Sequence, residues 1–392
     1  MAILTIDKLD VKGKRVLVRV DFNVPQDESG AITDDTRIVA TLPTIRFILD
    51  HGGSAILMSH LGRPKSGPDP KYSLAPVAKR LSQLLGRDVL MLPDCIGPIV
   101  EQACREARPG MVIMLENLRF HPEEEAGEPA FAKQLAMLGD LYVNDAFGTA
   151  HRAHASTSVI AQFYTQAAAG FLMAKEIDFL GRVVSNPERP YAVVLGGAKV
   201  SSKLKVIENL LPKADKIIIG GGMAYTFLAA QGHGMGKSLV EAELIPTAKS
   251  ILEKDAAGKI ILRTDHICAE SFDSNATPIP ISTVDIPTNL MGLDIGPATV
   301  ELFTKHLSDA RMVFWNGPMG VFEFPSFAAG TRAIGEVIAR APVSIVGGGD
   351  TISAVNQMGL ADRYTHVSTG GGASLEFVEG LELPGIKALT KV

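Results

Sequence analysis

One pattern recurs through the first half of the sequence: a short apolar run rich in β-branched residues, a polar or glycine-marked turn, then an amphipathic stretch. Such alternation is typical of βα units with parallel strands. We predict strands over Arg15–Val20, Ala55–Ser59, Val89–Leu92, Met111–Leu115 and Leu141–Asn144. Helices are predicted over Arg37–Asp50 and Leu74–Leu85, which are followed by glycines at positions where a helix end favours a left-handed residue.

The pattern resumes after a helical stretch that begins near Gly170 and stops at Asn186–Pro187. Strands in this half are predicted over Tyr191–Leu195, Lys216–Ile219, Ile260–Leu262, Met312–Trp315 and Val343–Val346. The chain has 392 residues, and single cores stop growing beyond roughly 250–300 residues. We therefore expect an α/β protein of two doubly wound, Rossmann-like domains, each a mainly parallel sheet flanked by helices, joined by an interdomain helix and hinge. The expected ranges are 1–170, 171–188 for the interdomain helix, 189–378, and a terminal segment over 379–392.

Composition limits the partners and the compartment. The chain has 38 lysines and arginines and 43 aspartates and glutamates, so its net charge is 38 − 43 = −5. A negative chain repels polyanions, and we therefore expect no nucleic-acid partner. No apolar run reaches the roughly 18 residues of a membrane helix, and the N-terminal stretch lacks a secretory pattern. We expect a cytoplasmic protein with no membrane partner. Cys95, Cys104 and Cys268 form no C-x-x-C pair, which argues for reduced thiols and against a disulfide framework or a zinc site.

Basic residues follow the predicted strands of the first half. In open parallel sheets ligands bind beyond the carboxyl ends of the strands, and a guanidinium grips an oxyanion with two hydrogen bonds. One such arginine is more often a surface residue, whereas a set at neighbouring strand ends predicts a site for a small polyanion. The set is Arg37, His60, Arg63, Arg119 and Arg152, with Asp21 and Asn23 available for hydroxyl groups.

Glycine-rich loops follow the predicted strands of the second half. They are GGAK at Gly196–Lys199, GGGM at Gly220–Met223, NGP at Asn316–Pro318, GGGDT at Gly347–Thr351 and TGGGA at Thr369–Ala373. Glycine lets backbone N–H groups approach an oxyanion, and a helix that starts there adds its positive end. Backbone geometry alone explains any one glycine pair. Several loops together with lysines predict phosphate binding.

Two charged groups in these loops suit a nucleotide. Lys199 and Lys203 are four residues apart and would share one face of a helix that began there. Cations are disfavoured at a helix start unless an anion compensates, so the pair indicates a ligand. Asp350 within its glycine loop can hold magnesium through one carboxylate, or cap the helix that follows. Both roles remain open at this point.

Other nucleotide and metal motifs fail on spacing. GHGMGKS at Gly232–Ser238 lacks the first glycine of a P-loop, because Gln231 stands there. No G-x-G-x-x-G follows the first predicted strand and no H-R-D catalytic loop occurs. His151 and His154 lack a third metal ligand and are interpreted as structural. These failures weigh against a dehydrogenase and a protein kinase.

Ten segments, in order and over nearly the whole chain, resemble the signature set of phosphoglycerate kinases: RVDFNVP, SHLGRP, LENLRF, NDAFGTAHRAHAS, GGAKVSSK, GGGM, GLDIGP, WNGPMGVFE, GGGDT and TGGGA. The resemblance implies that the N-terminal domain binds 3-phosphoglycerate or 1,3-bisphosphoglycerate and that the C-terminal domain binds ADP or ATP with Mg²⁺. It also implies a monomer that closes about a hinge, and a terminal segment that packs on the N-terminal domain.

The same resemblance implies roles for single residues. Substrate contacts fall to Asp21, Phe22, Asn23, Arg37, His60, Leu61, Gly62, Arg63, Arg119 and Arg152. Nucleotide contacts fall to Gly197, Lys199, Lys203, Gly221, Gly292, Asn316, Glu323, Gly348, Gly349, Asp350 and Thr351, with Asp350 as the metal ligand and Glu323 near the ribose. The catalytic roles fall to Arg37, Lys203, Gly371 and Gly372.

Two other readings stay open from the sequence. One is a different α/β enzyme that binds a nucleotide, such as a dehydrogenase or another kinase that forms an acyl phosphate. The other is a catalytically silent scaffold or binding module, since fold alone does not fix function. The absent dinucleotide motif weighs against a dehydrogenase, and the presence of Arg37, Lys203 and Asp350 weighs against a silent scaffold.

Overall fold

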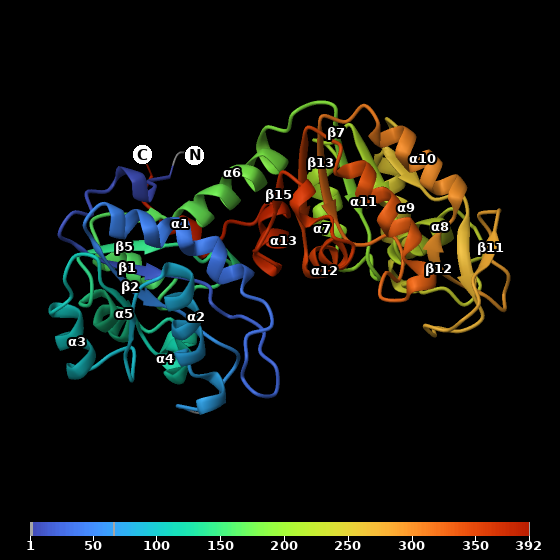
Figure 1. The fold of residues 1–392 in the computed structure, drawn as a ribbon. Coiled ribbons are helices and arrows are strands. Elements are labelled where there is room, and N and C mark those ends of the chain that lie inside the picture. Colours follow the sequence, from blue (N-terminus) through green and yellow to red (C-terminus); the bar gives the residue numbers. More distant parts are fainter. Residues whose placement is uncertain (1–2, 66, 392) are drawn as a thin grey trace. The chain divides into compact units, whose positions relative to one another are not determined.

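The computed structural model describes residues 3–65 and 67–391. The chain divides into two compact units. The first runs up to Asp178 and also includes the segment from Glu382 onward, and the second is Phe179–Leu381. The boundary falls within one helix, α6 (Phe171–Ser185) (Figure 1).

The first unit is built on a parallel sheet with strand order β3-β4-β2-β1-β5-β6. The central strand β1 pairs in parallel with β2 and β5, so that Val18 lies opposite Leu57 and Val143. These apolar residues are fully buried, as expected for a strand covered on both faces. The strands are β1 Arg15–Arg19, β2 Ser54–Met58, β3 Val89–Met91, β4 Val112–Met114, β5 Leu141–Asn144 and β6 Ala167–Ala169. The five predicted strands are confirmed, whereas β6, made of alanines, carries no β-branched signal.

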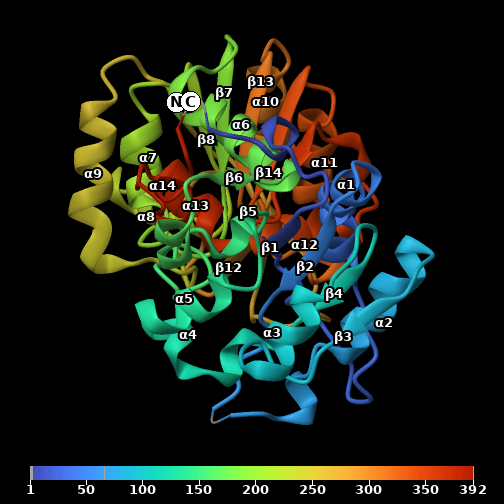
Figure 2. The ribbon, with the colours of Figure 1, turned by 90° about the vertical axis from the view of Figure 1, so that its left-hand side faces the viewer.

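Helices cover both faces of this sheet. Figure 2 shows α4 and α5 on the opposite side of β1 from α1 and α2. Helix α2 ends at Gly86, whose φ of 66° closes it in the left-handed region. The α-helices of the unit before α6 are α1 Thr36–Asp50, α2 Ala75–Leu85, α3 Pro98–Arg105, α4 Pro122–Ala126 and α5 Pro129–Ala136. Short 3₁₀ helices are η1 Ile6–Lys8, η2 Pro70–Tyr72, η3 Leu118–Phe120, η4 Phe147–Thr149 and η5 Val159–Phe163.

The second unit repeats the architecture with strand order β15-β14-β13-β7-β8-β9. All strand pairs of this six-stranded sheet are parallel, as predicted. The strands are β7 Tyr191–Leu195, β8 Lys216–Ile219, β9 Ile260–Leu262, β13 Met312–Asn316, β14 Val343–Gly347 and β15 His366–Val367. The helices are α7 Leu204–Leu210, α8 Met223–Ala230, α9 Ile245–Lys254, α10 Pro297–Leu307, α11 Ala329–Ile338, α12 Gly349–Gln357 and α13 Gly372–Val378, with 3₁₀ helices η6 Ala242–Leu244, η7 Pro325–Phe327 and η8 Ala361–Arg363.

A small antiparallel sheet in the second unit was not predicted. Its strand order is β11-β10-β12, from β10 His266–Ala269, β11 Ile279–Ile281 and β12 Met291–Ile295. Its strands are short, and Pro280 lies within β11. Proline is confined to edge strands of a sheet, and β11 is such an edge. Short runs interrupted by proline give only a weak sequence signal for strands, which explains why this sheet was not predicted.

The terminal segment belongs to the first unit. The Leu4 amide donates to the Thr390 carbonyl at 2.8 Å, and the Thr390 amide donates to the Ala167 carbonyl at 2.9 Å. The short helix α14 (Pro384–Lys387) begins beside Ala150, whose carbonyl accepts from the Gly385 amide at 2.8 Å. The two ends of the described chain therefore lie side by side, as both views show (Figures 1 and 2).

Two further expectations concern thiols and membranes. Cys95, Cys104 and Cys268 are free and buried, as predicted. Among the helices of the described residues, none combines the length and the apolar character that a membrane span requires.

Candidate functional site

In the first unit an ion pair joins the loop after β1 to the start of α1. Arg37, the second residue of α1, donates from Nη1 to Oδ2 of Asp21 at 2.8 Å. Asp21 is largely buried, whereas the guanidinium of Arg37 is partly exposed. The carboxylate thus holds Arg37 at the carboxyl edge of the sheet and leaves part of its fork open to a ligand.

His60, two residues after β2, lies at the centre of the basic residues. It is buried, and its Nδ1 is 3.9 Å from Oδ1 of Asp21. Its pKa is lowered well below the ordinary value, first by burial and then by the positive charges of Arg19, Arg119, Arg37 and Arg152. The structure therefore brings three of the four predicted arginines together around a neutral histidine.

Gly62 connects the second strand end to Arg119. The Gly62 amide donates to Oδ1 of Asn23 at 2.8 Å, and its carbonyl accepts from Nη1 of Arg119 at 2.7 Å. Its φ is +61°, and a Cβ there would lie 2.4 Å from the ring of Tyr72. Both the backbone conformation and the close approach require glycine.

Glu125 of α4 neutralises part of this cluster. Its Oε1 lies 3.1 Å from Nε of Arg119 and 4.0 Å from Nη1 of Arg152. The carboxylate side chain is half exposed, and Arg119 is nearly buried. Glu125 thus competes with any anion that binds these two arginines.

The remaining predicted substrate residues differ in what they present. Arg63 is exposed and can reach a ligand with its side chain. Phe22 and Leu61 have buried side chains, and their amides donate within the fold. The Phe22 amide donates to Oγ of Ser59 at 2.9 Å, and the Leu61 amide donates to Oδ1 of Asn117 at 3.2 Å. Phe22 and Leu61 therefore shape the site from inside the fold.

A buried polar network beneath the cluster was missed by sequence reasoning. Arg19, 1% exposed, donates from Nε to Oγ of Ser156 at 2.8 Å. Glu124 accepts from the amide and the hydroxyl of Ser156 at 2.9 and 2.6 Å, and burial raises its pKa. The only sequence signal was an arginine inside a strand whose neighbours are apolar.

In the second unit no helix begins at Lys199, so Lys199 and Lys203 do not share a helical face. Helix α7 begins at Leu204, so both lysines precede it. A turn forms instead, in which the Lys203 amide donates to the Val200 carbonyl at 2.8 Å and Oγ of Ser202 donates to the Lys199 carbonyl at 2.9 Å. A serine hydroxyl that bonds nearby backbone offers the chain an alternative to helix.

Lys203 nevertheless contacts another predicted residue. Its Nζ donates to Oδ1 of Asn316, the last residue of β13. Burial lowers the pKa of Lys203, while the negative charges of Asp350 and Glu379 act in the opposite direction. Lys203, Asn316 and Asp350 are thus gathered by the second sheet. Asp350 itself is exposed in the first turn of α12.

The glycine loops of the second unit pack backbone against backbone. The Gly197 amide donates to the Pro318 carbonyl at 3.0 Å, and the Gly221 amide donates to the Met319 carbonyl at 3.1 Å. Gly221 has φ +62°, and a Cβ there would lie 2.4 Å from the amide nitrogen of Gly197. Close packing would therefore require glycine at position 221 even without its positive φ. A Cβ on Gly197, in contrast, would meet open space.

Arg263 fixes this packing and was also missed. It is nearly buried, and Nη2 donates to the Gly221 carbonyl at 2.6 Å while Nη1 donates to the hydroxyl of Tyr225 at 2.7 Å. The same Tyr225 hydroxyl explains Gly292, where a Cβ would lie 2.0 Å from that oxygen. Arg263 follows β9 by one residue, where its sequence signal is that of any arginine at a strand end.

The last predicted nucleotide and catalytic residues lie at loop ends. Glu323 and Gly349 are exposed. Thr351 is buried, and its hydroxyl accepts from the Gly317 amide at 2.7 Å. Gly348 in the GGGDT loop has φ +89° and lies beside Nδ2 of Asn316. In the TGGGA loop, Gly371 has φ +52° and is the N-cap of α13, and Gly372 is the first residue of that helix.

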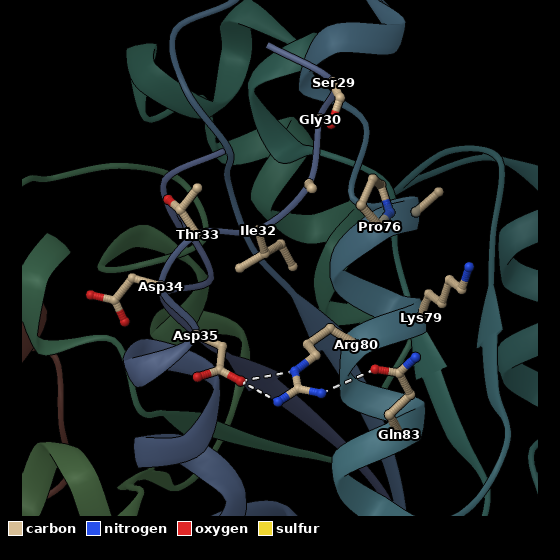
Figure 3. Close-up of a pocket in the computed structure, with 12 residues that line it drawn as sticks. Ser29, Gly30, Ile32, Thr33, Asp34, Asp35, Pro76, Lys79, Arg80 and Gln83 are labelled. Carbon is tan, nitrogen blue, oxygen red and sulfur yellow. Dashed lines mark hydrogen bonds and ion pairs between the residues drawn. The ribbon is translucent and has the colours of Figure 1, made fainter. Parts of the chain in front are cut away.

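A groove of about 950 Å³ in the first unit contains none of these residues. It lies between the loop Ser29–Asp35 and α2 (Figure 3). Arg80 donates there to Oδ2 of Asp35 at 2.8 Å and to Gln83 at 3.1 Å. Its main cation is already paired, so we place the candidate site at the strand ends instead.

The sequence matches a family model described as "Phosphoglycerate kinase" over residues 6–381. It is 55% identical over 401 residues to a phosphoglycerate kinase of Koribacter versatilis (strain Ellin345), with 100% of each chain covered. It is 54% identical over 394 residues to one of Moorella thermoacetica, again with 100% of each chain covered.

Solved structures agree with these sequence matches. A phosphoglycerate kinase from Coxiella burnetii superposes with a TM-score of 0.91 at 41% identity, covering 98% of both chains. One from Pyrococcus horikoshii OT3 superposes with a TM-score of 0.85 at 34% identity, also covering 98% of both chains.

Proposed function

This chain belongs to the phosphoglycerate kinase family, and from that membership we propose how its residues carry out the reaction. The reaction is the reversible transfer of a phosphoryl group between 1,3-bisphosphoglycerate and ADP, which gives 3-phosphoglycerate and ATP. It is a step of glycolysis and, in reverse, of gluconeogenesis. The acceptor in the reverse direction is a carboxyl group.

We propose that the first unit binds the phosphoglycerate. Arg37, Arg119 and Arg152 would neutralise its phosphate and carboxylate, since guanidinium groups bind such anions through paired hydrogen bonds. The exposed Arg63 would join them, and neutral His60 would donate one hydrogen bond without adding charge. Asp21 and Asn23 would orient the hydroxyl. Support comes from the gathering of Arg37, Arg119 and Arg152 around His60.

We propose that the second unit binds the nucleotide on its glycine loops. Gly197, Gly221 and Gly292 would border the base and ribose, and Glu323 would accept from a ribose hydroxyl. Lys199 and Lys203 would reach the phosphates, together with the turn formed by Gly348, Gly349 and Thr351.

Mg²⁺ fits this second unit at Asp350. The ion takes one or two carboxylates together with phosphate oxygens and water, and Asp350 offers one exposed carboxylate near Lys203. When bound, the ion would offset the negative charge of the nucleotide phosphates. Asp350 would serve as its protein ligand.

The transfer itself needs no general base. A carboxylate of 3-phosphoglycerate is ionised at neutral pH and can attack the terminal phosphorus of ATP directly. Catalysis then consists of positioning and of stabilising charge on the equatorial oxygens. We propose that Arg37, Lys203 and the backbone N–H groups of Gly371 and Gly372 supply those contacts.

Direct in-line transfer requires donor and acceptor to meet. Because the proposed contacts are divided between two units, we propose that the units close about a hinge and exclude the water that would hydrolyse the acyl phosphate. We further propose a cytoplasmic monomer without a nucleic-acid partner, in keeping with a net charge of −5.

One observation carries the functional assignment to residues: basic side chains surround His60 in one unit, while Lys203, Asn316 and Asp350 gather in the other. The test is an assay of the purified protein with 3-phosphoglycerate, ATP and Mg²⁺, coupled to reduction of the acyl phosphate by a dehydrogenase. We expect the wild-type protein to turn over. We expect the Arg37→Ala and Lys203→Ala variants to lose turnover while remaining folded. Absence of turnover in the folded wild-type protein would overturn the assignment.

A further inference from the structure

Three side chains of the kinds that ligate metal ions lie together outside the proposed substrate and nucleotide sites. Asp94 and Cys95 stand in the turn between β3 and α3, and His121 follows η3. Their ligand atoms all lie within 4.8 Å of one another. Among the described residues they are the one such group of three. Cys95 and His121 are 26 positions apart in the sequence, so the absence of a C-x-x-C pair, which argued against a zinc site, does not bear on this group.

Hydrogen bonds already align two of the three ligand atoms. Oδ1 of Asp94 lies 2.7 Å from Nε2 of His121 and accepts from the Cys95 amide at 2.7 Å. Because a carboxylate only accepts hydrogen bonds, Nε2 of His121 carries a proton in this contact. Carboxylate and imidazole therefore face one another beside the thiol.

The surroundings hold these residues in place. The ring of His121 packs on Phe131 of α5, with centroids 5.3 Å apart. The Asp94 carbonyl accepts from the Glu116 amide at 3.3 Å, which ties the turn to the segment after β4. Cys95 is fully buried, whereas 49% of the Asp94 side chain is exposed and provides a path for an ion from solvent.

We propose that Asp94, Cys95 and His121 form a binding site for a divalent transition-metal ion of the zinc class, with one coordination position open to water. Sulfur, imidazole nitrogen and carboxylate oxygen are the ligands that Zn²⁺ takes, usually in tetrahedral geometry. Mg²⁺ and Ca²⁺ select oxygen ligands instead. Two negative ligands balance the charge of the ion.

Binding requires small movements and a balanced exchange of protons. Ligand atoms at about 2.0–2.3 Å from one tetrahedral ion are separated by roughly 3.3–3.8 Å, so Asp94 and His121, whose ligand atoms lie 2.7 Å apart, must part slightly. A metal–sulfur bond forms as the thiol proton of Cys95 leaves to solvent. The proton on Nε2 of His121 transfers to Nδ1 through solvent, which frees the Nε2 lone pair for the ion.

The ion would brace the segment that carries Arg119, which precedes His121 by two residues. This effect is measurable as thermal stability, since a ligand that binds only the folded state raises the melting temperature. The readout does not depend on catalysis, so it separates this site from the proposed Mg²⁺ ligand Asp350.

Co²⁺ titration of the reduced, metal-free full chain is the direct test, because sulfur ligation gives a charge-transfer band in the near ultraviolet. We expect one equivalent of Co²⁺ to produce the band, excess Mg²⁺ to leave it, and Zn²⁺ to abolish it by replacement. Cys95→Ser and His121→Gln should lose the band. Cys104→Ala, which removes another buried thiol, should keep it.

If a variant is less stable than the wild type, the change in its melting temperature on adding Zn²⁺ still reports whether it binds the ion. Zn²⁺ should raise the melting temperature of the wild type and of Cys104→Ala, and should leave that of His121→Gln unchanged. Absence of the band in the wild type would overturn the proposal. A band that persists in Cys95→Ser would overturn it as well, because the sulfur would then belong to another residue.

Discussion

Nη2 of Arg19 lies 3.2 Å from Nδ1 of His60, and both side chains are buried. A guanidinium can only donate hydrogen bonds, so Nδ1 of His60 accepts and the neutral ring carries its proton on Nε2. Burial first, and then the same positive charge, lowers the pKa of His60. A buried arginine outside the predicted site therefore sets the tautomer of the central histidine and adds to the effect of burial that keeps the ring neutral.

Replacing Arg19 by methionine should destabilise the protein by about 3–5 kcal/mol, because it leaves the buried Glu124 network without its cation. Urea denaturation checks this value. Arg80→Met removes a half-exposed ion pair with Asp35 and should cost no more than about 1 kcal/mol. If Arg19→Met cost as little as Arg80→Met, the buried network would have no structural role. We also expect a higher KM for 3-phosphoglycerate in Arg19→Met.

Replacing Glu125 by glutamine should lower the KM for 3-phosphoglycerate by roughly twofold to fivefold, because Arg119 and Arg152 lose the carboxylate that competes with the substrate. The effect should shrink as salt is added. Glu123→Gln, an exposed change on the same helix α4, is the control and should leave KM unchanged. A rise in KM for Glu125→Gln would show instead that Glu125 positions Arg119.

Gly62→Ala and Gly67→Ala separate backbone strain from steric conflict. Their φ values are +61° and +62°, yet a Cβ on Gly67 meets nothing within 4 Å, whereas one on Gly62 lies 2.4 Å from the Tyr72 ring. Gly67→Ala should cost about 1–2 kcal/mol of folding free energy, and Gly62→Ala should cost more. Only Gly62→Ala should raise KM for 3-phosphoglycerate, since its carbonyl accepts from Arg119. Equal costs in the two variants would mean that the Tyr72 ring moves freely.

Lys203→Ala should reduce kcat by about 100-fold or more while changing the Kd for ADP only a few-fold, since a contact made mainly in the transition state lowers kcat selectively. Steady-state kinetics and nucleotide titration measure the two quantities. Lys199→Ala serves as the matched loop control and should affect nucleotide binding more than kcat. Equal losses in kcat and affinity for Lys203→Ala would assign it to ground-state binding.

The stability of the second unit should depend on pH through Asp294. Burial raises the pKa of this carboxyl to about 7, against the counteracting N–H groups of Gly330 and Ile295. Between the ordinary value and about 7 the native state keeps a proton that the unfolded chain has lost. Asp294 therefore contributes stability that declines as pH rises across that window.

Comparison with Asp294→Asn isolates this contribution, because asparagine does not titrate. From about pH 5 to about pH 7, the wild type should lose about 2–3 kcal/mol of unfolding free energy relative to the variant. Asp285→Asn is the control. The Gly234 amide lowers the pKa of Asp285, which stays ionised throughout, so that variant should parallel the wild type. A constant difference between Asp294→Asn and the wild type would contradict a raised pKa.

Local patterns predicted much of the fold. Parallel strands covered on both faces are continuous apolar runs, and the runs at Leu141–Asn144 and Tyr191–Leu195 match β5 and β7 without a residue of error. Strand β6 was invisible because its three alanines carry no strand preference. Lys199 and Lys203 do not share the helical face that their spacing allows, because a serine-stabilised turn precedes α7, which begins only at Leu204.

The candidate site followed the same division. His60 and Arg119 were predicted because each follows a strand end, and parallel topology brings such positions to one edge of the sheet. The partners that fix them were not. Glu124 and Ser156 lie far from Arg19 in sequence and meet it only when β1 packs against the segments after η3 and η4.

The sequence by itself determined the alternation of strands and helices, the two parallel sheets, and the types of charged and glycine residues at their carboxyl ends, because these depend on local period and spacing. Only the tertiary structure decided which charges are buried and paired, which glycines are required by close packing, and that Asp94, Cys95 and His121 meet. Those properties arise from contacts between segments distant in sequence, and no local period encodes them.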